Sequence, residues 1–269
     1  RQLVPDVSLS YISLYGKLDE MSAGALTMRY FSLGSIQFTD DFGASLGEQK
    51  PNEFAIDGAY SRKLSDKFSM GVALRFIYSN LVPSLPSAGS ITVKPGVSGA
   101  GDISAYYTDE TKISGLNSRW AVGALISNMG AKITYTTSAN RDFIPTTLRL
   151  GGSLSTDFDQ YNTLMVTAEV NKLLVPTLPV YVKTASGADS TLNGKKVIDR
   201  GKDYNVGVVK GMYQSFYDAP GGFREEMKEY NWSLGAEYWY DKQFAIRAGF
   251  FHEPSTKGNR KYFTFGAGL

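Results

Sequence analysis

The sequence has no cysteine and a single histidine among its 269 residues. A chain without cysteine is neither a disulfide-stapled scaffold nor a zinc site built from thiolates. A zinc centre or a histidine-based catalytic site would need partners for His252 that the chain lacks. We therefore interpret His252, which stands beside Glu253 near the end of a strand pattern, as a surface residue, and we expect no metal, no cofactor and no enzymatic activity.

The chain also lacks a large excess of positive or negative charge, and it lacks long hydrophobic runs. The formal net charge is +2 and charged residues make up 20% of the chain. This balance argues against a nucleic-acid binder, which would carry a basic stripe, and against a disordered tail. A helical membrane protein needs apolar runs of about 20 residues, and Ser, Gly, Arg or Asp interrupts every apolar stretch within a few positions. The mean hydropathy of −0.20 suits a soluble protein and a membrane barrel equally, because only every second strand residue of a barrel meets lipid.

We expect no signal peptide at the start of the chain, since no charged start is followed by an apolar segment. Arg1 stands close to a strand pattern and Leu269 ends inside one. We expect a mature or trimmed piece that lacks elements at both ends.

A period of two is the strongest positive signal. In residues 68–79, six apolar side chains alternate with Ser, Gly, Ala, Arg and Ile, over a length close to the roughly 10 residues that a tilted strand needs to cross a bilayer. Strands of soluble proteins average only about 5–6 residues. The same alternation recurs, which gives about a dozen strands, at residues 7–11, 54–61, 120–127, 148–154, 164–171, 230–240 and 244–250, with less regular segments at 25–38 and 102–107 and a last one from 262.

The two faces of these strands favour lipid over a soluble core. The apolar face carries aromatic residues toward the strand ends, as interfacial girdles do: Tyr78, Trp120, Trp232, Tyr238 and Tyr240. The other face is small or polar and bears Arg75, Arg149, Glu169, Glu237 and Arg247. A polar lumen tolerates such charges, whereas a closed soluble core would pay heavily for each one left unpaired. The alternative is a soluble β-sandwich or a ligand barrel with its apolar side inward.

Connections alternate between short and long. The short ones are at 17–20, 65–67, 157–162 and 241–242, and the long ones at 39–52, 80–97 and 173–202. Outer-membrane barrels place short turns in the periplasm and long loops outside. This parity fails between Leu173 and Lys228, which indicates a missed element there. No linker divides the chain, so we expect one barrel domain over residues 1–269.

Two motifs could suggest chemistry. Glu225, Glu226 and Glu229 follow Pro220-Gly221-Gly222. A paired-carboxylate glycosidase site is conceivable there, but the solvated face of a short helix, or a charged loop plug, is the favoured interpretation. The glycines of residues 96–101 lack a Walker lysine and a strand-to-helix context, so they do not indicate phosphate binding.

Two proline-rigidified apolar loops give the candidate partner-binding residues. They are Leu81, Val82 and Leu85 in one loop and Leu174, Val175 and Leu178 in the other. Exposed apolar segments often mark contact with a partner or a greasy ligand. The alternative is that the loops fold onto their own barrel mouth.

Several stretches resemble the PorV family of outer-membrane proteins of the Bacteroidota type IX secretion system, distant relatives of FadL-type barrels. The most specific is Ser-Phe-Tyr-Asp-Ala-Pro-Gly-Gly-Phe-Arg-Glu-Glu at 215–226, which continues to Gly-Ala-Glu-Tyr-Trp-Tyr at 235–240. Asn-Met-Gly at 128–130 and Pro-Thr-Thr-Leu-Arg-Leu-Gly at 145–151 are shared with wider FadL-like barrels. The resemblance covers nearly the whole chain.

The resemblance implies a bacterial outer-membrane location and an antiparallel transmembrane barrel of about fourteen strands in the complete protein. It also implies a shuttle that binds secreted cargo through a C-terminal signal domain, collects it at a large SprA-type translocon and carries it to the surface-attachment complex. Outer-membrane lipid or detergent would surround it, no nucleic acid would bind, and the family supplies no catalytic residues.

Two other functions stay open. A FadL-like passive channel for hydrophobic solutes would require a continuous greasy path, whereas the inward-facing positions are rich in Ser, Gly and charge. An outer-membrane enzyme acting on lipid would require a clustered nucleophile and base, and His252 stands alone.

Overall fold

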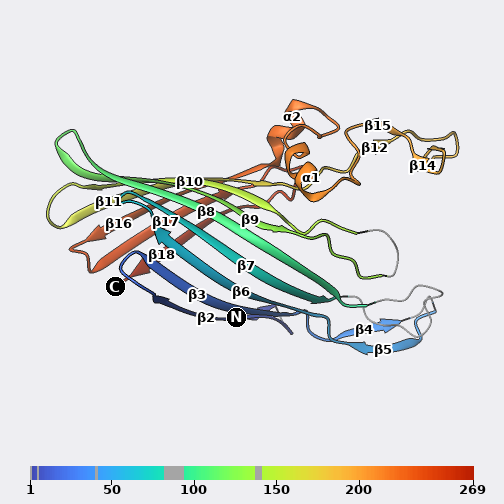
Figure 1. Ribbon diagram of the computed structural model, residues 1–269, viewed down its shortest axis with the longest axis horizontal. Helices are drawn as coiled ribbons and strands as arrows, with labels where there is room; N and C mark the ends of the chain where they lie inside the picture. The colour runs from blue at the N-terminus through green and yellow to red at the C-terminus, as the bar shows by residue number, and fades with distance from the viewer. Residues whose placement is uncertain (1, 5, 40–41, 82–93, 137–140) are drawn as a thin grey trace. The chain divides into compact units, whose positions relative to one another are not determined.

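The computed structural model describes residues 2–4, 6–39, 42–81, 94–136 and 141–269. Twelve strands follow one another in the hydrogen-bonded order β1-β2-β3-β6-β7-β8-β9-β10-β11-β16-β17-β18 (Figure 1). The chain divides into two compact units, the first with residues 1–63, 70–103 and 127–144 and the second with residues 64–69, 104–126 and 145–269. That the chain forms one barrel domain stays a prediction.

The first unit is built on antiparallel pairs of long strands. β2 pairs with β3, and β3 with β6, in unbroken register. A short hairpin of β4 and β5 stands in the connection between β3 and β6. The strands that begin in this part of the chain are β1 (Gln2–Val4), β2 (Val7–Lys17), β3 (Ser22–Ser32), β4 (Ile36–Thr39), β5 (Ser45–Gln49) and β6 (Asn52–Lys63). Three further strands have residues in both units: β7 (Phe68–Asn80), β8 (Gly96–Ile113) and β9 (Leu116–Gly130).

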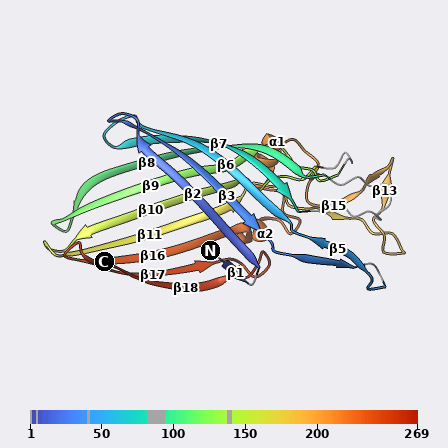
Figure 2. The same ribbon diagram turned by 90° about the horizontal axis from the view of Figure 1, so that it is seen from below.

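The second unit repeats the pattern with a long insertion. β10 pairs with β11, β11 with β16, β16 with β17 and β17 with β18, all antiparallel. Figure 2 shows β16, β17 and β18 side by side. The long strands are β10 (Thr147–Asp157), β11 (Asn162–Leu173), β16 (Tyr230–Tyr240), β17 (Phe244–His252) and β18 (Lys261–Gly268).

The insertion between β11 and β16 explains why the expected parity of turns fails. We call residues 174–229 the cap. The cap holds two helices and four short strands rather than a membrane-length strand, namely β12 (Val180–Tyr181), β13 (Thr191–Leu192), β14 (Lys195–Lys196), β15 (Ile198–Arg200), α1 (Val208–Gln214), α2 (Phe223–Glu226) and the 3₁₀ helix η1 (Met227–Glu229). Among the described residues, no helix combines the length and apolarity needed to cross a membrane.

The alternating pattern places apolar side chains on the outward face, as predicted. In β7, Leu74 is 76% exposed, and Val72 and Phe76 are exposed on the same face. The intervening Arg75 side chain is only 12% exposed. A soluble sandwich would bury the leucine and phenylalanine rows, so the structure rejects that alternative. Strand lengths of 11 to 13 residues in β2, β3, β6, β7, β10, β11 and β16 match the length of a tilted membrane strand.

The interior is correspondingly polar. Many of the buried side chains of the strands are polar or charged, among them Asp57, Ser79 and Ser98. One apolar cluster in the first unit joins Ala100, Ile133 and Ile144. Hydrogen bonds and ion pairs therefore hold much of the inner side, whereas hydrocarbon chains would cover the outer side.

Candidate functional site

An ion-pair network lies on the inward face of the first unit. The Arg75 guanidinium in β7 contacts the carboxylate of Asp57 in β6 and, at 3.0 Å, Oδ2 of Asp102 in β8. It also donates to the side-chain oxygen of Asn128 in β9, and Arg29 in β3 forms a second ion pair with Asp57. A guanidinium with its donors in a planar fork suits several acceptors at once. The network thus ties five strands together by inward side chains.

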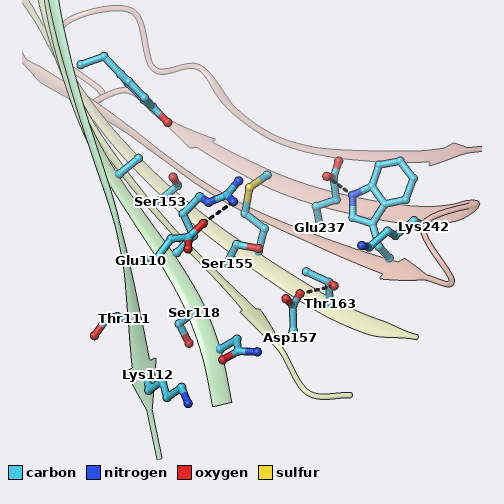
Figure 3. Close-up of a pocket in the computed structure, with 16 residues that line it drawn as sticks. Glu110, Thr111, Lys112, Ser118, Ser153, Ser155, Asp157, Thr163, Glu237 and Lys242 are labelled. Atoms are coloured by element: carbon cyan, nitrogen blue, oxygen red, sulfur yellow. Dashed lines mark hydrogen bonds and ion pairs between the residues drawn. The ribbon is translucent and has the colours of Figure 1, made fainter. Parts of the chain in front are cut away.

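The second unit contains a polar pocket of about 1000 Å³. Figure 3 shows Glu110, Ser153, Asp157, Thr163 and Glu237 around it. Thr163 Oγ1 donates to Asp157 Oδ1 at 2.7 Å. Charged and hydroxyl groups of this kind retain water beside the Met165 and Trp239 side chains, so the pocket suits polar or amphipathic solutes better than purely apolar ones.

A buried lysine near the end of β11 connects this strand to the cap. The Lys172 side chain is 1% exposed, and its Nζ lies 2.7 Å from Glu226 Oε1 and 2.9 Å from Glu229 Oε2. The same Nζ lies 4.8 Å from the centroid of the Tyr230 ring and 5.6 Å from that of Phe216. A buried ammonium requires such compensation, because desolvation of an unpaired charge costs several kcal/mol.

Further hydrogen bonds extend this cluster into the cap. Thr177 Oγ1 donates to Glu229 Oε1 at 2.6 Å, and Lys257 Nζ donates to the same oxygen at 2.8 Å. Although burial alone would raise the pKa of Glu229, hydrogen bonds from Lys257, Thr177 and Lys172 hold that pKa below its ordinary value. Glu229 is therefore held in its ionised form.

Asp218 sits at the edge of the same cluster in a different electrostatic environment. Its Oδ2 accepts hydrogen bonds from the Thr177 backbone N–H at 3.1 Å and from Gln214 Nε2 at 3.4 Å. Its Oδ1 is buried without a hydrogen-bond partner among the described residues. Burial raises the pKa of Asp218, and the neighbouring Glu226 and Glu229 raise it further.

The three carboxylates are the best metal-ligand set in the described part of the chain. One oxygen from each of Asp218, Glu226 and Glu229 lies within 4.8 Å of the others. However, the Lys172 ammonium already contacts Glu226 and Glu229. We therefore interpret the group as an ion cluster in which Lys172 and Lys257 balance the charges of Glu226 and Glu229.

Burial corrects one interpretation drawn from the sequence. The short helix predicted around Glu225, Glu226 and Glu229 is present as α2 and η1, but it is wrong that these acids share a solvated face. Glu226 and Glu229 have side chains only 6% and 8% exposed. Their partner Lys172 lies 54 and 57 positions away in sequence, beyond the reach of any local charge pattern.

The predicted partner-binding residues are spread over different environments. Leu174 is buried at 3% exposure, Val175 is half-buried and Leu178 is 66% exposed. Leu174 thus packs inside the protein, which agrees with the alternative that this loop folds onto its own barrel. Leu178, in contrast, is accessible to a partner. Leu81 is half-buried just after β7, and Val82 and Leu85 lie outside the described residues.

His252 lies in an aromatic cluster at the end of β17. Its ring stacks on Trp232, with centroids 5.0 Å apart. The adjacent Glu253 is buried and pairs with Arg260 Nε at 2.7 Å. The two neighbours in sequence therefore have separate structural partners.

Comparison with known proteins gives a family. A family model described as type IX secretion system protein PorV matches residues 1–180. No curated protein matches the chain. Among solved structures, a Pseudomonas aeruginosa FadL homologue aligns with 96% of this chain and 65% of its own at 10% identity and a TM-score of 0.39. The Escherichia coli outer-membrane transporter YddB aligns with 96% of this chain and 35% of its own at 12% identity and a TM-score of 0.32.

This chain therefore spans less than two thirds of the length of those two structures. The family match, in contrast, covers well over half of the chain and agrees with the all-β fold and its outward apolar rows. The chain belongs to the PorV family of type IX secretion system proteins, and it is an outer-membrane β-barrel protein.

Proposed function

We propose that this protein is a shuttle of the type IX secretion system. It binds secreted cargo through the cargo's C-terminal signal domain, receives it at an SprA-type translocon and delivers it to the surface-attachment complex. Membership of the PorV family supports the association with this system. The protein would act by binding and release, without catalysis.

The observation that carries the binding role is a set of exposed apolar side chains in one segment of the cap. We call residues 178–200 the arm. Backbone hydrogen bonds order the arm, including Val182 N to Val197 O at 2.9 Å and Ser190 N to Val182 O at 2.7 Å. Its exposed apolar side chains are Leu178, Val180, Val182, Leu192 and Ile198. Apolar groups held on an ordered backbone outside the long strands suit a protein partner, since little ordering entropy is lost on binding.

An ion-paired hairpin within the arm keeps these side chains in place. Asp189 contacts Lys183 Nζ at 2.5 Å and Lys196 Nζ at 2.8 Å. Hydrogen bonds from Lys183 and then Lys196 lower the pKa of Asp189. The hairpin therefore remains ion-paired at neutral pH, when cargo would bind.

The alternative, a passive FadL-like channel for hydrophobic solutes, has less support. Such a channel needs an apolar path, and the described pocket of the second unit is lined by Glu110, Arg119, Asp157 and Glu237 among other polar groups. Apolar solutes would have to displace water from these charged groups, and desolvation of a charged group costs free energy.

Affinity capture tests the proposal. The protein is isolated from its own membranes in mild detergent, and co-purifying molecules are identified by mass spectrometry. We expect a very large translocon barrel, or secreted proteins that share a C-terminal signal domain. A lone barrel that carries fatty acid would instead favour the channel.

Two variants assign the capture to the arm. Leu178→Ser combined with Leu192→Ser removes two of its exposed apolar side chains and should reduce cargo recovery. Leu64→Ser changes another exposed leucine, 54% exposed and in a short turn, and should leave recovery unchanged. Equal recovery in both variants would exclude the arm as the cargo-binding surface.

A further inference from the structure

Helix α1 of the cap has its polarity reversed relative to a helix of a water-soluble domain. Within α1 (Val208–Gln214) the buried residues are Gly211 and Gln214, and Ser215 and Asp218, which follow the helix, are buried as well. The exposed apolar side chains are Val209 and Tyr213 in α1, and Phe216 and Tyr217 in the turn that follows the helix. A helix in water buries its apolar stripe, so this arrangement indicates an apolar or interfacial environment on the exposed side.

The next helical segment shows the same reversal. Phe223 in α2 is 78% exposed, and Met227, one turn later, is 51% exposed. Between them Glu226 points to the inside, where it pairs with Lys172. The buried ion cluster thus takes up the acidic side chains and leaves the apolar ones outside. We call the exposed side chains of residues 209–228 the cap face.

The cap face adjoins the end of an outward apolar row. Lys172 pairs across the sheet with Tyr230, and two residues further along the same faces are Val170 and Trp232. Trp232 belongs to the predicted aromatic girdle. The Phe216 ring lies 5.6 Å from Lys172 Nζ, so α1 ends directly beside this row. Figure 1 shows α1 and α2 near the ends of the long strands, apart from the arm.

Four exposed basic residues and one exposed acid, Asp203, lie on or beside the cap face. Lys202, Lys210, Arg224 and Lys228 are exposed there, and Lys202 Nζ lies 3.8 Å from the centroid of the Tyr217 ring. Glu225 is half-buried and accepts a hydrogen bond from the Gly221 N–H at 2.6 Å. Aromatic and apolar side chains flanked by Lys and Arg are the signature of a helix that lies in the headgroup layer of an anionic membrane.

We propose that the cap face binds the anionic headgroup layer of the outer leaflet. The apolar side chains enter the boundary between headgroups and acyl chains, and the four basic residues contact lipid phosphates. The position of the cap face favours lipid over an acidic protein surface, because it adjoins the end of the outward apolar row, where headgroups would lie. The cap is then held between two supports, the Lys172 cluster on its inner side and lipid on the cap face. This leaves the arm as the part that projects from the membrane.

The absence of cysteine makes the test direct, because each introduced thiol is unique. Tyr213→Cys and Phe223→Cys are each labelled with an environment-sensitive fluorophore, and the full chain is reconstituted in vesicles that contain a lipid-attached quencher. Leu74→Cys reports an outward membrane position, and Leu192→Cys, in the arm, reports an exposed apolar position away from lipid. We expect quenching at positions 213 and 223 close to that at 74 and well above that at 192. Quenching no greater than at 192 would overturn the proposal.

Lipid charge provides the second readout. Vesicles of phosphatidylcholine alone are compared with vesicles that also contain phosphatidylglycerol. Quenching at 223 should rise in the anionic vesicles, and the combined variant Lys210→Ser, Arg224→Ser and Lys228→Ser should abolish that rise. Migration of the unheated barrel in gels shows that each variant is folded. Quenching that ignores lipid charge, or that needs an added protein, would contradict the proposal.

Discussion

Lys172 is a residue whose chemistry depends entirely on distant partners. Its ammonium is buried against Glu226 and Glu229. Lys172→Met keeps most of the side-chain volume but leaves these two carboxylates without their buried counterion. Removing one partner of a buried pair costs about 3–5 kcal/mol. We expect the cap to exchange its amide hydrogens much faster in this variant.

Lys195→Met is the matched control, because Lys195 is an exposed lysine of the cap that lies outside the cap face. It should leave hydrogen exchange in the cap unchanged. If both variants exchange at the wild-type rate, the Lys172 cluster does not hold the cap in place.

Asp218 makes the stability of the cap depend on pH with a defined sign. Burial raises its pKa above the ordinary value. The folded cap therefore binds this proton more tightly than the unfolded cap, and the resulting stability is present at low pH and lost as pH rises through the folded pKa. Asp218→Asn keeps an acceptor for Thr177 and removes the buried charge. The variant should resist proteolysis of the cap better than wild type at neutral pH.

The difference between Asp218→Asn and wild type should vanish in acid, below the ordinary aspartate pKa of about 3.9. Glu229 titrates in the opposite sense, because its lowered pKa gives stability that is lost as pH falls through the folded value. Glu229→Gln should therefore weaken the cap at neutral pH. A neutral-pH weakening by Asp218→Asn would refute the assigned sign.

At the scale of elements, the turn between β16 and β17 carries backbone strain that can be relieved. Asp241 and Lys242 have φ values of 51° and 54°, and Gln243 N donates to Tyr240 O at 3.1 Å. Positive φ at both central residues is the condition that favours glycine in a tight hairpin turn. Lys242→Gly should stabilise the barrel by about 1 kcal/mol in urea unfolding from vesicles.

Lys242→Ala separates this backbone effect from loss of the side chain. Alanine keeps the strain, so it should give no gain. A loss of stability in the glycine variant equal to that in the alanine variant would show that the turn is not strained.

The elements also differ in how far sequence predicts them. The long strands could be predicted because each carries its own alternation, and segment 68–79 corresponds to β7 within one residue at its end. The side chains that face inward, such as Arg75, followed from the same pattern. Side-chain alternation depends only on the local period of two, so it needs no knowledge of distant contacts.

The cap could not be predicted in the same way. Its helices bury polar residues and expose apolar ones, which reverses the pattern used to recognise a helix. Its ion cluster joins Lys172 to residues more than fifty positions away. The Glu225-Glu226 pair therefore suggested a solvated helix, although Lys172 determines the burial of Glu226. The strongest local signal in the region was its sequence resemblance to a family.

At the scale of the whole molecule, the long strands carry polar side chains on one face and apolar side chains on the other. The inward side chains form ion pairs and polar pockets, and the outward ones form apolar rows. Such an arrangement is stable only where hydrocarbon replaces water on the outside. The outer-membrane location and the proposed roles of the arm and the cap face all depend on this facing.

Lysine substitution at two adjacent positions of β7 measures the facing directly. Leu74→Lys places a charge in hydrocarbon and should destabilise the folded protein by about 2–4 kcal/mol in urea unfolding from lipid vesicles. Ala73→Lys places the same charge on the inward side, beside the Arg75 network, and should cost clearly less. Equal losses at both positions, or a larger loss at Ala73, would contradict the assigned facing.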